Sequence, residues 1–114
     1  MVVSNFSGDL REKIKKILSL MSVEDKIAQL MSVSIDQLLG DNNLFLRDRA
    51  SALIGRGVGQ ITRVAGSVKG FDPGEVARLI NEIQLFLVRE TRLGIPSIVH
   101  EECLAGVMGR GFTM

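Results

Sequence analysis

The feature that most constrains the fold is a strand–helix–strand pattern across residues 57–102. Val58–Val64 is a short β-branched run, which is typical of a strand, and Ile95–Val99 predicts a second strand. Between them, Asp72 and Pro73 are residues that favour the start of a helix. The apolar stripe of this helix consists of Val76, Leu79, Ile80, Ile83, Phe86 and Leu87. A unit of this kind places its two strands parallel to each other.

The parallel arrangement makes the predicted sheet incomplete. A parallel sheet needs cover on both faces and normally has more than two strands, but the sequence offers only two clear ones. We therefore expect an α/β fold that is rich in helix, has about two parallel strands and forms part of a larger domain.

The residues ahead of this unit, about 9–56, are typical of helices. The first helix is predicted over Asp9–Leu20. Its apolar face consists of Leu10, Ile14, Ile17, Leu18 and Met21. A second helix is predicted to begin after Ser22, because Ser22 and Asp25 form the pattern of a capping box. Its apolar side carries Val23, Ile27, Leu30 and Met31.

The pattern is weaker between Ser34 and Gly57. We expect a short apolar piece, then a turn at Gly40–Asn43, and then a helix that ends at Ile54. The apolar piece consists of Ile35, Leu38 and Leu39.

The composition argues against several partners and locations. The formal net charge is +1, so we expect neither nucleic acid nor a membrane surface as partner. No apolar run approaches the roughly 20 residues that span a bilayer. Cys103 is the single cysteine, which excludes an internal disulfide and favours a reducing, cytoplasmic location. Because Trp and Tyr are absent, we expect any aromatic platform for a sugar to lie outside this chain.

A polar cluster, His100–Cys103, follows the second predicted strand. Ligands of α/β folds bind at the carboxyl ends of the strands, so this cluster is the best candidate for a site. Side chains alternate along a strand. One face is therefore predicted to carry Ile98, His100 and Glu102, and the other Val99 and Glu101. The glycine-rich residues 105–111 would allow a ligand to approach the backbone closely.

Three other interpretations of these residues are weaker. A zincin-type metal site needs a second His where Leu104 stands, and the chain has a single His, so we expect no metal. Cys103 has only His100 as a neighbouring base, which favours a buried, inert thiol over a catalytic thiolate. The glycines of Gly55–Gly59 precede a strand, whereas a dinucleotide loop precedes a helix, so they indicate a turn.

Four segments occur in the order in which one known family has them. They are Leu20–Leu30, Gly57–Ile61, Asn81–Gln84 and, most specifically, Thr91–Gly106 with its Arg-Leu-Gly-Ile-Pro and His-Glu-Glu. By these segments the chain resembles the start of glycoside hydrolase family 3, the β-glucosidase and β-xylosidase group. The resemblance extends over roughly residues 9–114.

The resemblance implies a retaining, exo-acting β-glycosidase that works through a covalent glycosyl-enzyme intermediate and uses no cofactor. The implied substrate is a small β-glucoside or β-xyloside, and the implied fold is a (β/α)8 (TIM-type) barrel. Residues 1–114 would be its incomplete amino-terminal part, with leading helices at about 9–56 and a strand–helix–strand unit at about 57–102. Glu102 matches a carboxylate that binds sugar hydroxyls in the innermost subsite. Many members have His where this chain has Ala105, so that contact is not carried over.

The resemblance places no catalytic residue in this chain. The family's nucleophile is an Asp on a later barrel strand and its acid/base is a carboxylate further on, and neither motif occurs here. Retaining hydrolysis needs two carboxylates about 5 Å apart, and Glu101 and Glu102 are predicted on opposite strand faces. We therefore expect an inactive fragment that requires the rest of a barrel of roughly 250 residues or associates with itself. The alternative is a small non-catalytic binding or interaction module of the same ancestry.

Overall fold

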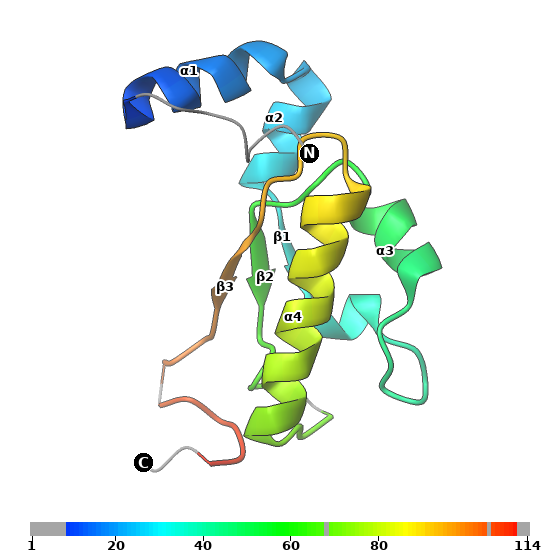
Figure 1. Cartoon of the computed structure of the whole chain (residues 1–114). Helices are drawn as coiled ribbons and strands as arrows, with labels where there is room; N and C mark the ends of the chain where they lie inside the picture. The colour runs from blue at the N-terminus through cyan, green and yellow to red at the C-terminus, as the bar shows by residue number, and fades with distance from the viewer. Residues whose placement is uncertain (1–8, 68, 105, 112–114) are drawn as a thin grey trace.

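The computed structural model describes residues 9–67, 69–104 and 106–111. The elements in chain order are α1 (Leu10–Leu20), α2 (Val23–Leu30), β1 (Ser32–Ser34), the 3-10 helix η2 (Ile35–Leu38), α3 (Arg47–Ile54), β2 (Gln60–Thr62), α4 (Pro73–Glu90) and β3 (Ile98–His100). Helices thus precede and separate short strands, which confirms the predicted α/β class (Figure 1).

The described strands form one open parallel sheet in the order β1-β2-β3. The predicted parallel arrangement of the two strands is confirmed by the pairing of β2 with β3. Their predicted number was too low, because β1 was missed. Only Val33 is apolar in that strand, between Ser32 and Ser34. A segment of three residues with one apolar side chain is too short to show the alternation that identifies a strand, so it could not be distinguished from the neighbouring helices. The barrel stays a prediction.

The two strands that were predicted are shorter in the structure. Val58–Val64 contains β2 as Gln60–Thr62, and Ile95–Val99 overlaps only the start of β3. Val58 and Val64 are nevertheless buried. The apolar run therefore reflects burial in the core, which extends beyond the residues that pair in the sheet.

Helix α4 follows its prediction closely. The Glu75 N–H donates to the side chain of Asp72 at 2.9 Å, and the Asp72 N–H donates back to the Glu75 carboxylate at 2.9 Å. This reciprocal capping box fixes the helix start. The helix then runs antiparallel to the strands along one face of the sheet (Figure 1).

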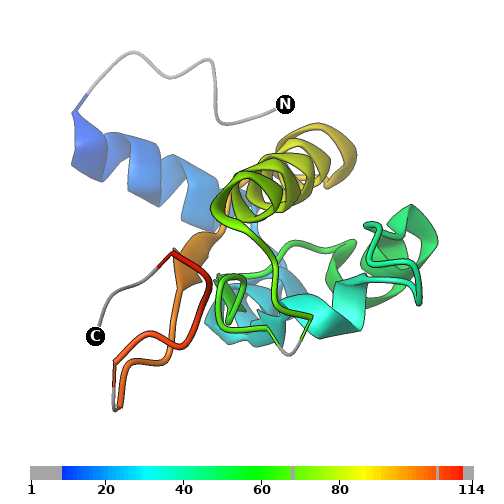
Figure 2. The same cartoon turned by 90° about the horizontal axis from the view of Figure 1, so that it is seen from below.

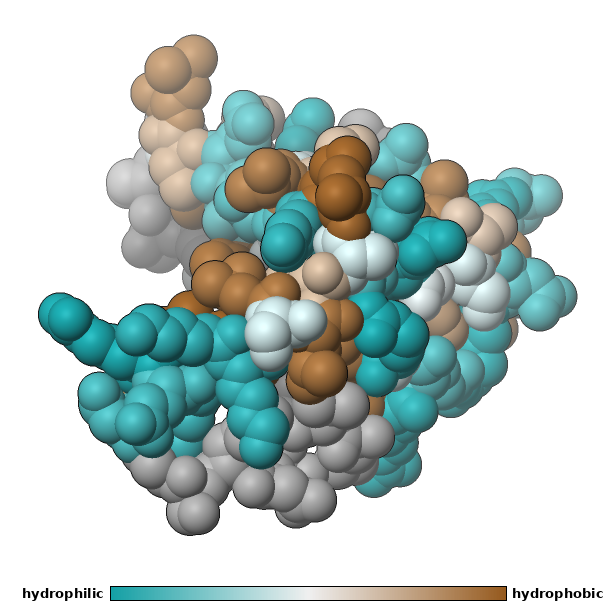
Figure 3. All heavy atoms as spheres, turned by 90° about the horizontal axis from the view of Figure 1, so that it is seen from above, coloured by the Kyte–Doolittle hydropathy of each residue, from teal (hydrophilic) through white to brown (hydrophobic). Residues whose placement is uncertain are grey.

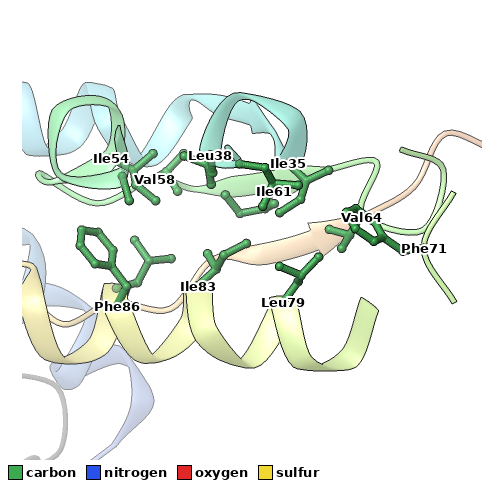
Figure 4. Packing of buried hydrophobic residues seen from close by; sticks show 13 residues of the cluster. Ile35, Leu38, Ile54, Val58, Ile61, Val64, Phe71, Leu79, Ile83 and Phe86 are labelled. Carbon is green, nitrogen blue, oxygen red and sulfur yellow. The ribbon is translucent and has the colours of Figure 1, made fainter. Parts of the chain in front are cut away.

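The hydrophobic core lies between α4 and the sheet with its connecting segments. Leu79, Ile83 and Phe86 of α4 face residues of η2, α3 and β2 (Figure 4). The Phe86 ring also meets Phe45 edge to face, with ring centroids 5.8 Å apart. The other residues of the core in Figure 4 include Ile35, Leu38, Ile54, Val58, Ile61, Val64 and Phe71. Residues of each predicted apolar segment after Ser34 thus contribute to one core.

Helices α1 and α2 lie at the end of the molecule opposite the carboxyl ends of the strands (Figure 1). The predicted capping box between Ser22 and Asp25 is confirmed. The apolar side chains of both helices, however, remain largely at the surface. Exposed members are Leu10, Ile14, Leu18, Leu20, Val23, Ile27, Leu30 and Met31. Hydrophobic side chains accordingly reach the surface in the view onto this end (Figure 3). In the part of the chain that the structure describes, no helix combines the length and apolar character needed to cross a membrane.

The weakly patterned segment before β2 also behaves as predicted. The turn at Gly40–Asn43 closes with the Asn43 N–H donating to the Gly40 carbonyl at 3.0 Å, and α3 ends at Ile54. Sequence reasoning missed the role of Gly59 ahead of β2. A Cβ at this position would lie 1.9 Å from the Gln29 carbonyl oxygen, so the contact between α2 and β2 requires glycine.

Candidate functional site

The carboxyl ends of the three strands meet at one edge of the sheet, at the bottom of Figure 1. Ser34, Thr62 and His100 end β1, β2 and β3 and are neighbours in the register. The residues before them in each strand pack on the core. Because side chains alternate along a strand, Ser34, Thr62 and His100 form a polar row on the opposite face.

Two atoms of this polar row are buried and have no hydrogen-bond partner among the described residues. They are Oγ1 of Thr62 and Nε2 of His100, which belong to register partners on adjacent strands. An unpaired buried polar atom costs free energy and is uncommon in folded proteins. The imidazole nitrogen and the hydroxyl both form hydrogen bonds readily. Both atoms are shielded from solvent in this structure, so they are not exposed to a ligand.

Glu101 faces the loop that follows β2. Its Oε1 accepts a hydrogen bond from the Ala65 N–H at 2.6 Å, and its Oε2 accepts one from the Gly66 N–H at 3.1 Å. Both carboxylate oxygens of Glu101 are therefore occupied by the backbone. Sequence reasoning did not predict this partner, because Ala65 and Glu101 are 36 residues apart.

Glu102, the residue that the resemblance singles out, takes no part in these contacts. It lies two residues beyond the end of β3, its side chain is exposed, and it makes no hydrogen bond or ion pair with the described residues. Its carboxylate is therefore free to accept hydrogen bonds from a ligand at the carboxyl ends of the strands.

The loop after β2 is tied to both neighbouring strands. The Arg63 N–H donates to the His100 carbonyl at 3.0 Å, and Arg63 itself adopts a left-handed backbone conformation with φ 60. On the other side, Ser67 Oγ donates to Asp36 Oδ1 at 2.6 Å. Asp36 belongs to η2, directly after β1. The segments that follow β1, β2 and β3 are thus connected by hydrogen bonds at the edge where the polar row lies.

The remaining residues of the cluster differ from their predictions. The prediction of a buried thiol was wrong, because Cys103 is exposed in the loop after β3. Its Sγ lies 3.8 Å from the Glu101 carbonyl oxygen. Ala105 lies outside the described residues. Within the described ranges, no group of three or more His, Cys, Asp or Glu side chains is placed to hold a metal ion.

A second charged group lies at the opposite end of the sheet. Asp25 is 2% exposed, and its carboxylate accepts from the Ser22 N–H at 2.9 Å and pairs with Arg92. Arg56 Nη1 is 3.9 Å away. The hydrogen bond from the Ser22 backbone is the largest of the effects that lower the pKa of Asp25; Arg92 adds to it and burial opposes it. Sequence reasoning found the cap but missed both arginines. This group joins α2 to the end of α4 and is structural.

Comparisons with known proteins identify the family of this chain. Residues 22–114 match the family described as "Glycosyl hydrolase family 3 N terminal domain". The chain is also 28% identical over 112 residues to a protein of Formosa agariphila named "Putative beta-xylosidase". That alignment covers 96% of this chain but 14% of the relative, so the chain spans about a seventh of the relative's length. Because the family match covers most of the sequence, the chain belongs to glycoside hydrolase family 3, and residues 22–114 match the family's N-terminal domain.

Proposed function

We propose that this chain contributes to a retaining, exo-acting β-glycosidase that removes terminal β-linked glucose or xylose. In this proposal Glu102 accepts hydrogen bonds from sugar hydroxyls in the innermost subsite. The observation that carries it is the carboxylate of Glu102, which is exposed at the carboxyl ends of parallel strands and has no partner among the described residues, in a chain of this family. A carboxylate is a strong acceptor for hydroxyl donors, and strand carboxyl ends are where such folds bind ligands.

We further propose that the polar face of the sheet lines the interior of a closed barrel. Only one face of the described sheet is covered by α4, and the outer edges of β1 and β3 have no strand beside them in the described ranges. A parallel sheet is stable when both faces are covered and its edges are paired or protected. Further strands of a longer polypeptide would satisfy both requirements and would extend the site beyond the residues of this chain.

The chain by itself should not catalyse hydrolysis. Retaining hydrolysis uses two carboxylates about 5 Å apart, one as nucleophile and one as acid/base. In the candidate site both oxygens of Glu101 are held by backbone amides, which leaves Glu102 as the available carboxylate of the cluster. We expect the purified chain to leave nitrophenyl β-xyloside and nitrophenyl β-glucoside unhydrolysed. Turnover that persists after removal of host glycosidases would contradict this part of the proposal.

The role of Glu102 is best tested in a chimera. This chain would replace the segment that it matches in the Formosa agariphila relative, and the intact relative would serve as the positive control. We expect Glu102→Ala to lower kcat/KM by about ten- to a thousandfold, since hydrogen bonds to a charged group contribute about 1.5–3 kcal/mol each. Glu82→Ala, at an exposed position of α4, is the matched control. Near-unchanged kcat/KM in a folded Glu102→Ala chimera would overturn the assignment.

A further inference from the structure

Glu101 connects two loops that are far apart in sequence. Its carboxylate lies 2.6 Å from the Ala65 nitrogen and 3.1 Å from the Gly66 nitrogen, so it is held at two points by the loop after β2. Hydrogen bonds to a charged acceptor are about twice as strong as those between neutral groups. The backbone position of Glu101 is therefore tied to Ala65 and Gly66 as well as to its own strand.

The loop after β2 is itself firmly placed. Val64 is fully buried in the core and Ala65 is nearly so. Ser67 holds the far end of the loop through its 2.6 Å hydrogen bond to Asp36. There is also little free space around the carboxylate, since a Cβ on Gly66 would lie 3.1 Å from Glu101 Oε2. Glu101 is thus bound to a part of the molecule that the core fixes.

Glu102 has no comparable support. It is exposed and beyond the last paired residue of β3, and its side chain contacts none of the described polar groups. Glu101 and Glu102 share a planar peptide bond, so the backbone between their Cα atoms has few free dihedral angles. Holding the Glu101 side chain at the loop after β2 therefore restricts the orientation of the backbone from which Glu102 extends.

We propose that Glu101 is a positioning residue that aims Glu102 at the ligand through its link to the loop after β2. The proposal rests on the proposed sugar-binding role of Glu102 and adds a second residue with a different task. A binding group works best when the residues around it hold its geometry before the ligand arrives. A displacement of about 1 Å at a reacting or binding group can lower the rate about a hundredfold.

The first test is spectroscopic and needs neither sugar nor catalysis. Cys103 is exposed, is the single cysteine and adjoins Glu102, so a nitroxide label there reports the order of this loop. We expect restricted motion in the parent chain, clear loosening in Glu101→Gln and more in Glu101→Ala. Glu102→Gln, the matched control with the same loss of charge, should leave the label unchanged.

Amide signals identify the contact that is lost. In both Glu101 variants the Ala65 and Gly66 amide protons should shift upfield, because they no longer donate to a carboxylate, while Glu102→Gln should leave them in place. The proposal is overturned if Glu101→Ala keeps the label as ordered as in the parent chain, or if Glu102→Gln loosens it equally. This outcome is independent of whether the chimera turns over substrate.

The second test is a double-mutant cycle in the chimera. Glu101→Gln should lower kcat/KM by about ten- to a hundredfold when Glu102 is present. In the Glu102→Ala background the same Glu101→Gln change should lower kcat/KM by less than about threefold, because the carboxylate that Glu101 positions is then absent. Equal losses in both backgrounds would overturn the positioning role. If Glu102→Ala is silent while the label still loosens in Glu101→Gln, the proposed role of Glu102 fails and the link between the loops stands.

Discussion

The two faces of the sheet differ in chemistry although the same three strands form both. The face toward α4 carries Val33, Ile61 and Val99, and the other carries Ser32, Ser34, Gln60, Thr62, Ile98 and His100. Packing against α4 explains the apolar face. No described helix packs on the polar face, where the exposed fraction of Ile98 is 68%.

The difference separates the residues that stabilise this chain from those available to bind. Apolar burial against α4 supplies the main favourable free energy of folding. Polar side chains on the second face add little to that burial, and two of their atoms have no hydrogen-bond partner among the described residues. A face that served stability alone would carry apolar or fully paired groups. We therefore expect substitutions on the first face to alter stability strongly and those on the second to alter it weakly.

The largest expected effect is the contrast between two isoleucines on neighbouring strands. Ile61→Ala, on the face toward α4, should lower the free energy of unfolding by about 2–5 kcal/mol. Ile98→Ala, on the polar face, should change it by less than about 1 kcal/mol, since its side chain is mostly in solvent. Urea denaturation of both variants measures the contrast. If Ile61→Ala does not fold, Ile61→Val should still cost about 0.5–1.5 kcal/mol. Equal losses of unfolding free energy at Ile61 and Ile98 would contradict the proposed difference between the two faces.

A buried polar group with full pairing should fall between these extremes. Asp25→Asn removes the charge that Ser22 and Arg92 stabilise, and we expect a loss of about 1.5–3 kcal/mol at neutral pH. Because folding lowers the pKa of Asp25, its charged form stabilises the fold above the pKa of the unfolded chain. That contribution should disappear as the pH falls below about 4. Urea midpoints at neutral and acidic pH should therefore converge between parent and variant, and a constant difference would contradict this mechanism.

The smallest change in the free energy of unfolding is expected at the Thr62 hydroxyl, and this change should be a gain in stability. Thr62→Val replaces a buried Oγ1 that has no described partner with a methyl group, and should raise stability by up to about 1 kcal/mol. Thr91→Val is the matched control, because Thr91 Oγ1 donates to the Leu87 carbonyl at 2.5 Å and its loss should cost about 1 kcal/mol. Thermal melts of the pair test the signs. A loss of stability at both positions would indicate that Thr62 has a partner in solution.

Elements with many consistent local signals were predictable from the sequence. Helix α4 combines a capping box, a proline in its first turn and a long apolar stripe, and its start agrees with the structure. Strand β1 has one apolar residue. Its pairing with β2 depends on residues 28 positions later in the sequence, since Ser32 pairs with Gln60. Local patterns do not contain that information.

The candidate site was predictable in place but not in detail. The polar cluster lies at the end of β3, where the strand pattern predicted it. The opposite directions of Glu101 and Glu102 stay a prediction. Which of the two carboxylates is occupied depends on Ala65 and Gly66, which only the tertiary structure brings near. The same limit applies to Arg92, which meets Asp25 across 67 residues, and to the exposure of Cys103.

The pairing of Asp25 with Arg92 has a consequence for synthesis on the ribosome. At about 5–20 residues per second, Arg92 is added roughly 3–13 s after Asp25, and until then α2 lacks its link to the end of α4. The apolar side chains of Ile27 and Leu30 are exposed in the folded chain as well, so in this interval the difference is that α2 is not yet held by Arg92. We expect the segment Leu10–Leu30 to be a binding site for chaperones on nascent chains, and Arg92→Ala to prolong that association.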